Sequence, residues 1–430
     1  MFEIREKPEM VERAMLVSIY FDPSEAGEKQ AMLDELEDLV SNLGIGIAGK
    51  HLIKSRDMHA KFLCGTGKAQ EVKQLALDCR ADCVVFDNML SPSQQREWER
   101  LVDECVIDRE EVILDIFARR ARTREATLQV ELARMQYSLP RMARMWNHLD
   151  RQGGGSGGGK GGGGAARGEG EKQIEVDRRL ARARIEAIQR ELVLVTRQRA
   201  TQRKERERQA VATAAIVGYT NAGKSSLLSL VSGSEVMARD MLFATLDTTT
   251  RKIELPHGQP LLLTDTVGFI RNLPHRLVEA FKSTLEEAVL ADFLIQVVDA
   301  SDPEAVRHYE TTLEVLNELG AGDKPMIVVL NKVDLVPEER RGALETLLAP
   351  HFSGRVVPMS VKEGNGEGDL LNACVEMLES RVRRARFLIP YTRSDLVAAM
   401  HSEGKVFSTE YVEEGTLLEA VLPVAFYTKL

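Results

Sequence analysis

The chain has 430 residues, 43% of them hydrophobic, and a formal net charge of −9. This length predicts about two to four domains, and the apolar content excludes a disordered chain. The negative charge excludes a general basic field, so contact with nucleic acid requires a local basic patch. The charged N-terminus is unlike a signal peptide, and no run of about 18 apolar residues occurs. We therefore expect a cytoplasmic protein that does not span a membrane.

The cysteines give no sign of a metal site. Their number is odd, and their spacings fit no zinc-binding pattern. We expect reduced cysteines, as in most cytosolic proteins. They are Cys64, Cys79, Cys83, Cys105 and Cys374.

Residues 1–122 alternate predicted strands and helices. An apolar run from Ala14 to Tyr20 predicts a strand, and a helical pattern follows from Glu25 to Leu43. Farther along, Cys83 to Asp87 predicts a buried strand, and Ser91 to Val102 a helix. This alternation predicts an N-terminal α/β domain.

Residues 123–209 predict two helices separated by glycine. Apolar residues recur at alternating spacings of four and three in the first helix, and Pro140 should kink or end it. Residues 153–170 are almost all glycine, which predicts a loop. The two apolar seams predict an antiparallel helical hairpin. They consist of Leu128, Leu132, Met135, Leu139 and Met142, and of Ile185, Ile188, Leu192 and Val195.

The second of these helices carries a basic face, which is the local patch that RNA phosphates would require. The alternative is a solvated face with internal salt bridges. The glycine-rich loop, with Arg151, Lys160 and Arg167, fits either a segment that reaches into an RNA crevice or a slack connector. The basic residues of the helix are Arg178, Arg179, Arg182, Arg184, Arg190, Arg197, Arg199, Arg203, Lys204, Arg206 and Arg208.

Two further regions complete the chain. Residues 210–381 alternate strands and helices again, and the motifs below predict a P-loop GTPase domain there. Residues 382–430 predict a strand, a helix and two more strands, which is a small C-terminal α/β domain.

A phosphate-binding loop follows the apolar strand that ends at Gly218. The pattern Gly218-Tyr-Thr-Asn-Ala-Gly223-Lys224-Ser225 stands between a strand and a helix, as such a loop requires. Its backbone N–H groups and the helix N-terminus favour phosphate, Lys224 should reach the β- and γ-phosphates, and Ser225 should bind Mg²⁺. The predicted nucleotide-binding residues here are Gly218, Tyr219, Thr220, Asn221, Ala222, Gly223, Lys224, Ser225 and Ser226.

A second phosphate motif ends the apolar run PLLLT. Asp265 at the strand end is suited to hold Mg²⁺ through water, and Gly268 to sense the γ-phosphate. Thr266 and Val267 lie between them, and we include all four residues in the site.

The predicted base specificity depends on Asn331, Lys332, Val333 and Asp334. The carboxylate of Asp334 can accept from two guanine donors that adenine lacks, which predicts GTP over ATP. Ser360, Val361 and Lys362 follow the next strand and should close over the base. Related GTPases usually carry alanine at the position of Val361, but this contact depends mainly on backbone.

A segment between these motifs must supply a threonine to Mg²⁺ and the γ-phosphate. It contains the predicted nucleotide-binding residues Phe243, Ala244, Thr245, Leu246 and Asp247. The chemistry alone leaves Thr245, Thr248, Thr249 and Thr250 as candidates.

Several motifs resemble the HflX family of GTPases, and the resemblance covers nearly the whole chain. Most GTPases lack those outside the nucleotide site. They include Phe86 to Pro92, Asp108-Arg109, Gln129 to Leu132, Tyr137 to Arg141, the glycine loop, Glu175 to Arg179, Phe243 to Arg251 and Asp265 to Phe269.

The resemblance implies that Thr245 and Ser225 bind Mg²⁺. It implies that the N-terminal domain, hairpin and glycine loop engage rRNA of the large (50S) ribosomal subunit, and that the GTP form splits stalled ribosomes. Nucleotide binding in the N-terminal domain is a further implication, which Gly65 to Lys68 fit only loosely; a short glycine turn is the simpler interpretation. We expect a monomer.

Phe269 follows Gly268 where many GTPases carry a glutamine that orients water. An apolar side chain cannot do this by hydrogen bonding, so we expect slow intrinsic hydrolysis that the ribosome accelerates. No catalytic replacement is evident, although His275 is nearby. The competing interpretations are a GTP-dependent ribosome-assembly factor that does not split ribosomes and an ATP-driven RNA remodeller, which Asn331 and Asp334 disfavour.

Overall fold

The computed structural model describes residues 11–144, 175–195, 211–233, 242–243, 245–256, 258–272, 282–348, 355–378, 382–423 and 426. The chain divides into two compact units, one formed by Met1–Val193 with Leu273–Ala280 and the other by Leu194–Asn272 with Phe281–Leu430. None of the helices in the described ranges is both long and apolar enough to cross a membrane.

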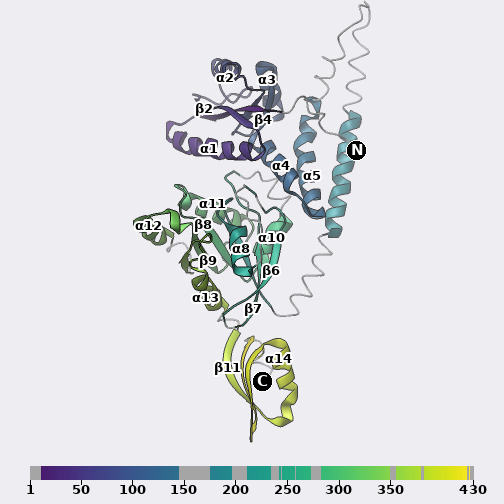
Figure 1. The fold of residues 1–430 in the computed structure, drawn as a ribbon. Coiled ribbons are helices and arrows are strands. Elements are labelled where there is room, and N and C mark those ends of the chain that lie inside the picture. Colours follow the sequence, from purple (N-terminus) through teal and green to yellow (C-terminus); the bar gives the residue numbers. More distant parts are fainter. Residues whose placement is uncertain are drawn as a thin grey trace, which may run out of the picture. The chain divides into compact units, whose positions relative to one another are not determined.

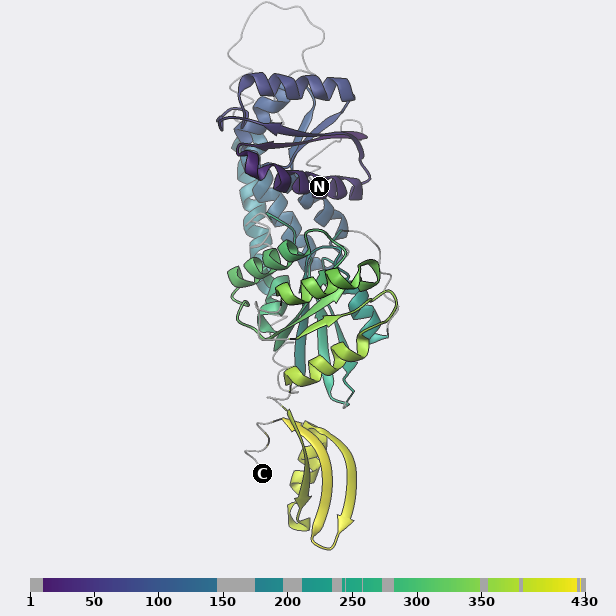
Figure 2. The same cartoon turned by 90° about the vertical axis from the view of Figure 1, so that its left-hand side faces the viewer.

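The N-terminal unit contains a parallel sheet of order β2-β1-β3-β4 (Figure 1). Helix α1 covers one face of the sheet, and α2 and α3 cover the other (Figures 1 and 2). The strands are β1 (Arg13–Tyr20), β2 (Gly46–Lys54), β3 (Cys83–Phe86) and β4 (Cys105–Asp108), and the helices are α1 (Ala26–Asn42), α2 (Thr66–Cys79) and α3 (Pro92–Val102).

The core of this sheet explains the short, wholly apolar strand β3. All four residues of β3 are buried, as expected where helices cover both faces of a parallel sheet. Trp98 of α3 is fully buried, and its ring lies edge-on to that of Phe62, with centroids 5.1 Å apart. Helix α2 begins directly after Gly65, so the short glycine segment serves as a helix start.

The predicted hairpin follows the sheet. Helix α4 (Arg109–Arg120) leads to α5 (Arg124–Ser138), the 3-10 turn η2 (Leu139–Arg144) and a helix over residues 175–195. Pro140 lies in η2, so α5 ends just before it, as expected. Arg124 pairs with Glu191, and Arg184 with Glu131, which shows that the two helices run antiparallel.

The second unit contains a six-stranded sheet of order β10-β9-β8-β5-β7-β6, in which only β6 is antiparallel to its neighbour. The strands are β5 (Ala212–Gly218), β6 (Thr249–Glu254), β7 (Pro260–Asp265), β8 (Phe293–Asp299), β9 (Met326–Asn331) and β10 (Val356–Pro358). The helices are α8 (Lys224–Ser232), α10 (Lys282–Leu290), α11 (Ala305–Glu318), α12 (Glu338–Leu348) and α13 (Glu367–Leu378).

Strand β6 was not predicted from the sequence, which assigned its threonines only to a segment near Mg²⁺. Its β-branched residues favour an extended backbone, and the strand pairs with β7. The hydroxyls of Thr250 and Thr264 lie 2.9 Å apart across this pair. The threonines at the end of the segment therefore have a place in the sheet.

The C-terminal region forms an antiparallel sheet of order β11-β13-β12 with one helix on its face (Figure 1). Met400 of this helix packs with Leu418 and Leu422 in a small separate core. The elements are β11 (Val382–Ile389), α14 (Ser394–Glu403), β12 (Lys405–Val412) and β13 (Gly415–Pro423), in the predicted order.

Candidate nucleotide site

The phosphate-binding loop joins β5 to α8 and requires glycine at both ends. Gly218 has φ +144°, and a Cβ atom there would lie 2.3 Å from the carbonyl oxygen of Val297. Gly223 has φ +99°, and its Cβ would lie 2.2 Å from Nδ2 of Asn331. Only glycine readily adopts these two positive φ angles. The loop thus packs against β8 and the end of β9, with Asn221 exposed and Ala222 buried.

Lys224 begins α8 and is buried, with 6% of its surface exposed. Its Nζ donates a hydrogen bond of 2.6 Å to the carbonyl oxygen of Tyr219. Burial lowers the pKa of Lys224 to about 8, and the carboxylate of Asp265 opposes that shift. Because burial destabilises the positive charge of Lys224, an anionic ligand beside the amino group would stabilise that charge.

Three oxygen-bearing side chains meet where α8, β7 and the threonine-rich segment approach one another. The hydroxyls of Ser225 and Thr245 lie 2.6 Å apart, and each donates to Oδ2 of Asp265 at 2.7 Å. Oδ1 of Asp265 is buried and has no partner in the described residues. Burial raises the pKa of Asp265, while Lys224 and the two hydroxyls counteract this.

This arrangement fits Mg²⁺, which prefers hard oxygen ligands and would compensate the buried carboxylate of Asp265. Among the four candidate threonines, Thr245 is the one whose hydroxyl meets Ser225, whereas Thr250 pairs with Thr264. Phe243 and Leu246 beside it are buried, Asp247 and Ser226 are half-buried, and Ala244 lies outside the described residues.

The segment after β7 is fastened to the phosphate-binding loop. The backbone N–H of Thr220 donates to the carbonyl of Phe269 at 2.8 Å, and the N–H of Phe269 donates to Gly218 at 3.1 Å. Thr266 donates from Oγ1 to the carbonyl of Ile216, and Val267 beside it is buried.

Gly268 lies very close to this loop. A Cβ atom there would be 2.9 Å from both Nζ of Lys224 and Cα of Thr220. Gly268 therefore faces the lysine that is predicted to contact the γ-phosphate. Its neighbour Phe269 is 1% exposed, so that apolar side chain lies in the core. His275 lies outside the described residues.

The predicted base-recognition residues gather at the ends of β9 and β10. Nδ2 of Asn331 donates to the carbonyl of Ala222 at 2.8 Å, and its Oδ1 accepts from the N–H of Val361 at 3.1 Å. Lys332 has φ +61° and pairs with Asp299 at 2.6 Å. Val333 is half-buried and Asp334 is exposed.

The loop after β10 is held by its own backbone. Ser360 exchanges two hydrogen bonds of 3.1 Å with Asn365, and its Oγ accepts from the N–H of Glu363. The Val361 side chain packs against the domain core, so valine fits where related GTPases carry alanine. Lys362 is exposed.

One group of contacts gave no signal in the sequence. The Tyr219 ring stacks on His308 of α11, with centroids 3.7 Å apart and an angle of 7° between the rings. The Tyr219 hydroxyl accepts from the backbone N–H of Arg271, whose guanidinium pairs with Glu304 at 2.9 Å. Only the fold brings these distant residues together.

Family models match most of the chain. The GTP-binding GTPase N-terminal model matches residues 30–118, the GTP-binding GTPase middle-region model matches 120–206, and the 50S ribosome-binding GTPase model matches 213–332.

Curated relatives extend this similarity to the full length. The GTPase HflX of Lacrimispora saccharolytica is 41% identical over 100% of this chain and 98% of that protein. The protein of the same name from Chlamydia pneumoniae is 40% identical over 98% and 88%, and that from Escherichia coli 39% over 97% and 95%.

The fold and the phosphate-binding loop define a P-loop GTPase, an enzyme that binds guanine nucleotides and hydrolyses GTP. Similarity over the full chain then identifies the particular group. This protein belongs to the HflX family of GTPases.

Proposed function

We propose that this GTPase binds the large ribosomal subunit in its GTP form and splits stalled 70S ribosomes into subunits. Membership in the HflX family and the match to a 50S ribosome-binding GTPase model support ribosome association. The observation that carries the proposal is the basic face of the helix over residues 175–195, in a chain whose net charge is negative.

The exposure of this face supports contact with rRNA. Arg179 and Arg182 are exposed and form no ion pair with described residues. Arg184 pairs with Glu131, and Arg190 pairs with Glu186 at 3.7 Å, so salt bridges take up part of the face. The unpaired arginines are available to phosphates of RNA. Basic residues beyond position 195 lie outside the described residues.

In the proposed nucleotide site, Gly218 to Ser226 hold the phosphates and Asn331 to Asp334 with Ser360 to Lys362 hold guanine. Ser225 and Thr245 would bind Mg²⁺ directly, with Asp265 behind them. When bound, the ion would neutralise charge that develops on the transferred phosphoryl group. The contacts of these side chains with one another support these assignments.

The proposed hydrolysis is slow until the ribosome is bound. The burial of Phe269 supports this, because its side chain cannot orient the attacking water. We expect turnover to rise when ribosomes are added. Equal turnover with and without ribosomes would contradict this part of the proposal.

Sucrose-gradient profiles of intact 70S ribosomes test the proposed splitting. Wild-type protein with a non-hydrolysable GTP analogue should increase the free subunits, whereas Lys224→Ala should leave the profile unchanged. Binding to subunits without loss of 70S ribosomes would instead support an assembly factor. ATP that displaced GTP at equal concentration would point to an RNA remodeller.

We also propose a cytoplasmic monomer with domain boundaries near residues 122, 209 and 381. Light scattering during size-exclusion chromatography should give the mass of one chain. Limited proteolysis should cut near these boundaries, and cell fractionation should place the protein in the cytoplasm.

A further inference from the structure

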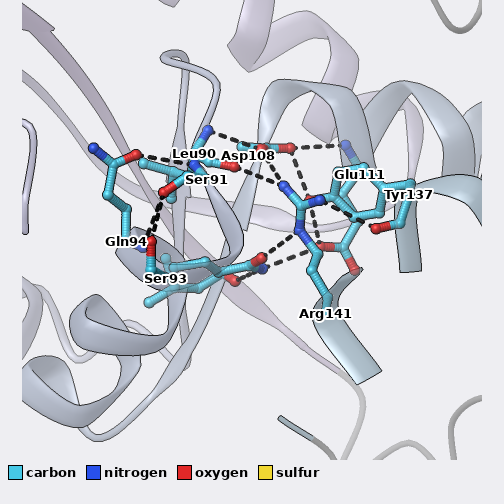
Figure 3. Close-up of polar contacts among 10 residues, drawn as sticks. Leu90, Ser91, Ser93, Gln94, Asp108, Glu111, Tyr137 and Arg141 are labelled. Atoms are coloured by element: carbon cyan, nitrogen blue, oxygen red, sulfur yellow. Dashed lines mark hydrogen bonds and ion pairs between the residues drawn. The ribbon is translucent and has the colours of Figure 1, made fainter. Parts of the chain in front are cut away.

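Three sequence motifs that the nucleotide site leaves unused meet in one place in the N-terminal unit (Figure 3). They are the segment from Phe86 to Pro92, the pair Asp108-Arg109 and the segment from Tyr137 to Arg141. Polar groups of these motifs, together with the side chains of Gln95 and Glu111, form a largely buried cluster that we name the Asp108–Arg141 joint. It consists of Leu90, Gln95, Asp108, Glu111, Tyr137 and Arg141.

Arg141 lies in η2, just after the first hairpin helix, and makes the most contacts in the joint. Its guanidinium donates to the Leu90 carbonyl at 2.6 Å, to Oε1 of Gln95 at 2.8 Å and to the Tyr137 carbonyl at 3.1 Å. It also lies 3.6 Å from the centre of the Tyr137 ring and 3.6 Å from Oδ2 of Asp108. One side chain thus connects η2 to α3 and to the loop before it.

Asp108 is completely buried at the junction of β4 and α4. Its carboxylate accepts from the N–H of Leu90 at 3.0 Å, the N–H of Glu111 at 3.1 Å and the hydroxyl of Tyr137 at 3.1 Å. Burial raises the pKa of Asp108, and these backbone donors together with Arg141 oppose the shift. A buried carboxylate is tolerated only with such partners.

The next residue fixes the same junction to the other side of the sheet. Arg109 donates to Asp87 at 2.9 Å, pairs with Glu35 and donates to the carbonyl of Met32 at 3.1 Å. Met32 and Glu35 belong to α1, which covers the face opposite to α3 (Figure 1). The start of α4 is therefore held from both faces.

We propose that Arg141 is a positioning residue whose contacts with Asp108 and its neighbours hold the hairpin at a fixed orientation to the N-terminal sheet. A lysine could replace the charge but not the planar guanidinium, whose three nitrogens each donate to a different acceptor. Partly satisfied buried polar groups are costly, so the arrangement of hairpin and sheet that satisfies the whole joint is favoured over arrangements that leave some of its groups without partners. The motifs that meet here therefore serve orientation rather than direct contact with a ligand.

This orientation matters for the proposed function, on which the second half of the inference rests. The second hairpin helix exposes Arg179 and Arg182, and the hairpin and the sheet belong to the same compact unit. If the hairpin adopts the binding orientation only part of the time, the apparent Kd for the large subunit rises in inverse proportion to that fraction. If the hairpin held this orientation for only about one tenth of the time, binding to the large subunit would be about tenfold weaker.

The first measurement is a distance distribution in the full-length chain. Spin labels are introduced through non-natural residues at Gln70 of α2 and Ala183 of the second hairpin helix, which are both exposed. Arg141→Gln should broaden the distribution, and Arg141→Lys and Tyr137→Phe should broaden it less. The matched control is Arg134→Gln, because Arg134 lies on the preceding helix α5 but forms a partly exposed pair with Asp115 at 3.1 Å.

The second measurement is binding to purified 50S subunits, with circular dichroism as the check of folding. We expect Arg141→Gln to weaken binding about tenfold, while the helical signal and the affinity for GDP stay at the wild-type level. An unchanged distance distribution in Arg141→Gln would overturn the positioning role. A broadened distribution with unchanged 50S affinity would overturn its functional half. Failure of the wild type to bind 50S subunits would contradict the proposed function and leave the distance result to decide the joint.

Discussion

The side-chain amide of Asn331 donates to the carbonyl oxygen of Ala222 at 2.8 Å, and so joins the base-recognition loop to the phosphate-binding loop. Its other end accepts from the N–H of Val361. Asn331→Ala would leave both partners unsatisfied, which should lower the free energy of unfolding by about 1–3 kcal/mol and weaken GDP binding. Urea denaturation measures the first effect. Asn365→Ala removes an exposed amide and should change stability by less than about 0.5 kcal/mol.

Asp334→Asn should change base choice without changing stability. The carboxylate is exposed and has no hydrogen-bond partner in the described residues, so its loss leaves nothing unsatisfied in the protein. Replacement removes the acceptor for two guanine donors and should weaken GTP binding by about 100-fold or more. Xanthosine triphosphate should bind better to the variant than to the wild type. Competition experiments with both nucleotides check this, and unchanged preference would contradict the role of Asp334.

Thr245→Ala should lower ribosome-stimulated GTP turnover by about 100-fold and weaken its dependence on Mg²⁺. The reason is that the Thr245 hydroxyl meets Ser225 and Asp265. Thr250→Ala is the matched control, since Thr250 bonds to Thr264 within the sheet. Turnover measured over a range of magnesium concentrations separates the two. A greater loss of turnover in Thr250→Ala than in Thr245→Ala would show that Thr245 is not the threonine that binds Mg²⁺.

Gly268→Ala should impair the GTP-bound state more than the GDP-bound state. A Cβ atom at this position would lie 2.9 Å from the Lys224 amino group and from Cα of Thr220. We expect GTP turnover to fall by about 100-fold, because the γ-phosphate must fit beside these groups, while the affinity for GDP falls less, since only the β-phosphate contact of Lys224 is affected. Gly342→Ala in α12, where a Cβ has open space, should leave both unchanged. Equal loss of GDP and GTP binding would contradict a role specific to the γ-phosphate.

Nucleotide affinity should fall as the pH rises above 8. Burial lowers the pKa of Lys224 to about 8, and the phosphates of a bound nucleotide would raise it again. Binding therefore takes up a proton above this pH, whereas below it the lysine is already charged. The affinity for GDP should be about fourfold lower at pH 8.5 than at pH 7. Calorimetry in buffers of different ionisation enthalpy should detect the proton, and Lys224→Arg should show no uptake.

The candidate nucleotide site could be proposed largely from the sequence, because its residues lie in short motifs at the ends of apolar strands. Gly218 and Gly223 stand at the two positions where the structure leaves no room for a side chain. The parallel strands of the nucleotide-binding sheet were evident for the same reason, since buried parallel strands are continuous apolar runs, whereas the polar, antiparallel strand β6 was not predicted. The family resemblance was confirmed by full-length relatives.

Other features depended on contacts between distant segments. The chemistry of the segment left four threonines open for Mg²⁺, and only the family resemblance pointed to Thr245; it is packing that brings Thr245 rather than Thr250 to Ser225. Likewise, Tyr219 stacks on His308 without any local pattern that connects them. The sequence by itself determined the class of enzyme and its nucleotide motifs, since those depend on local backbone geometry. Only the tertiary structure decided how Asp108 and Arg141 meet, because a buried charge finds its partner through the fold of the whole domain.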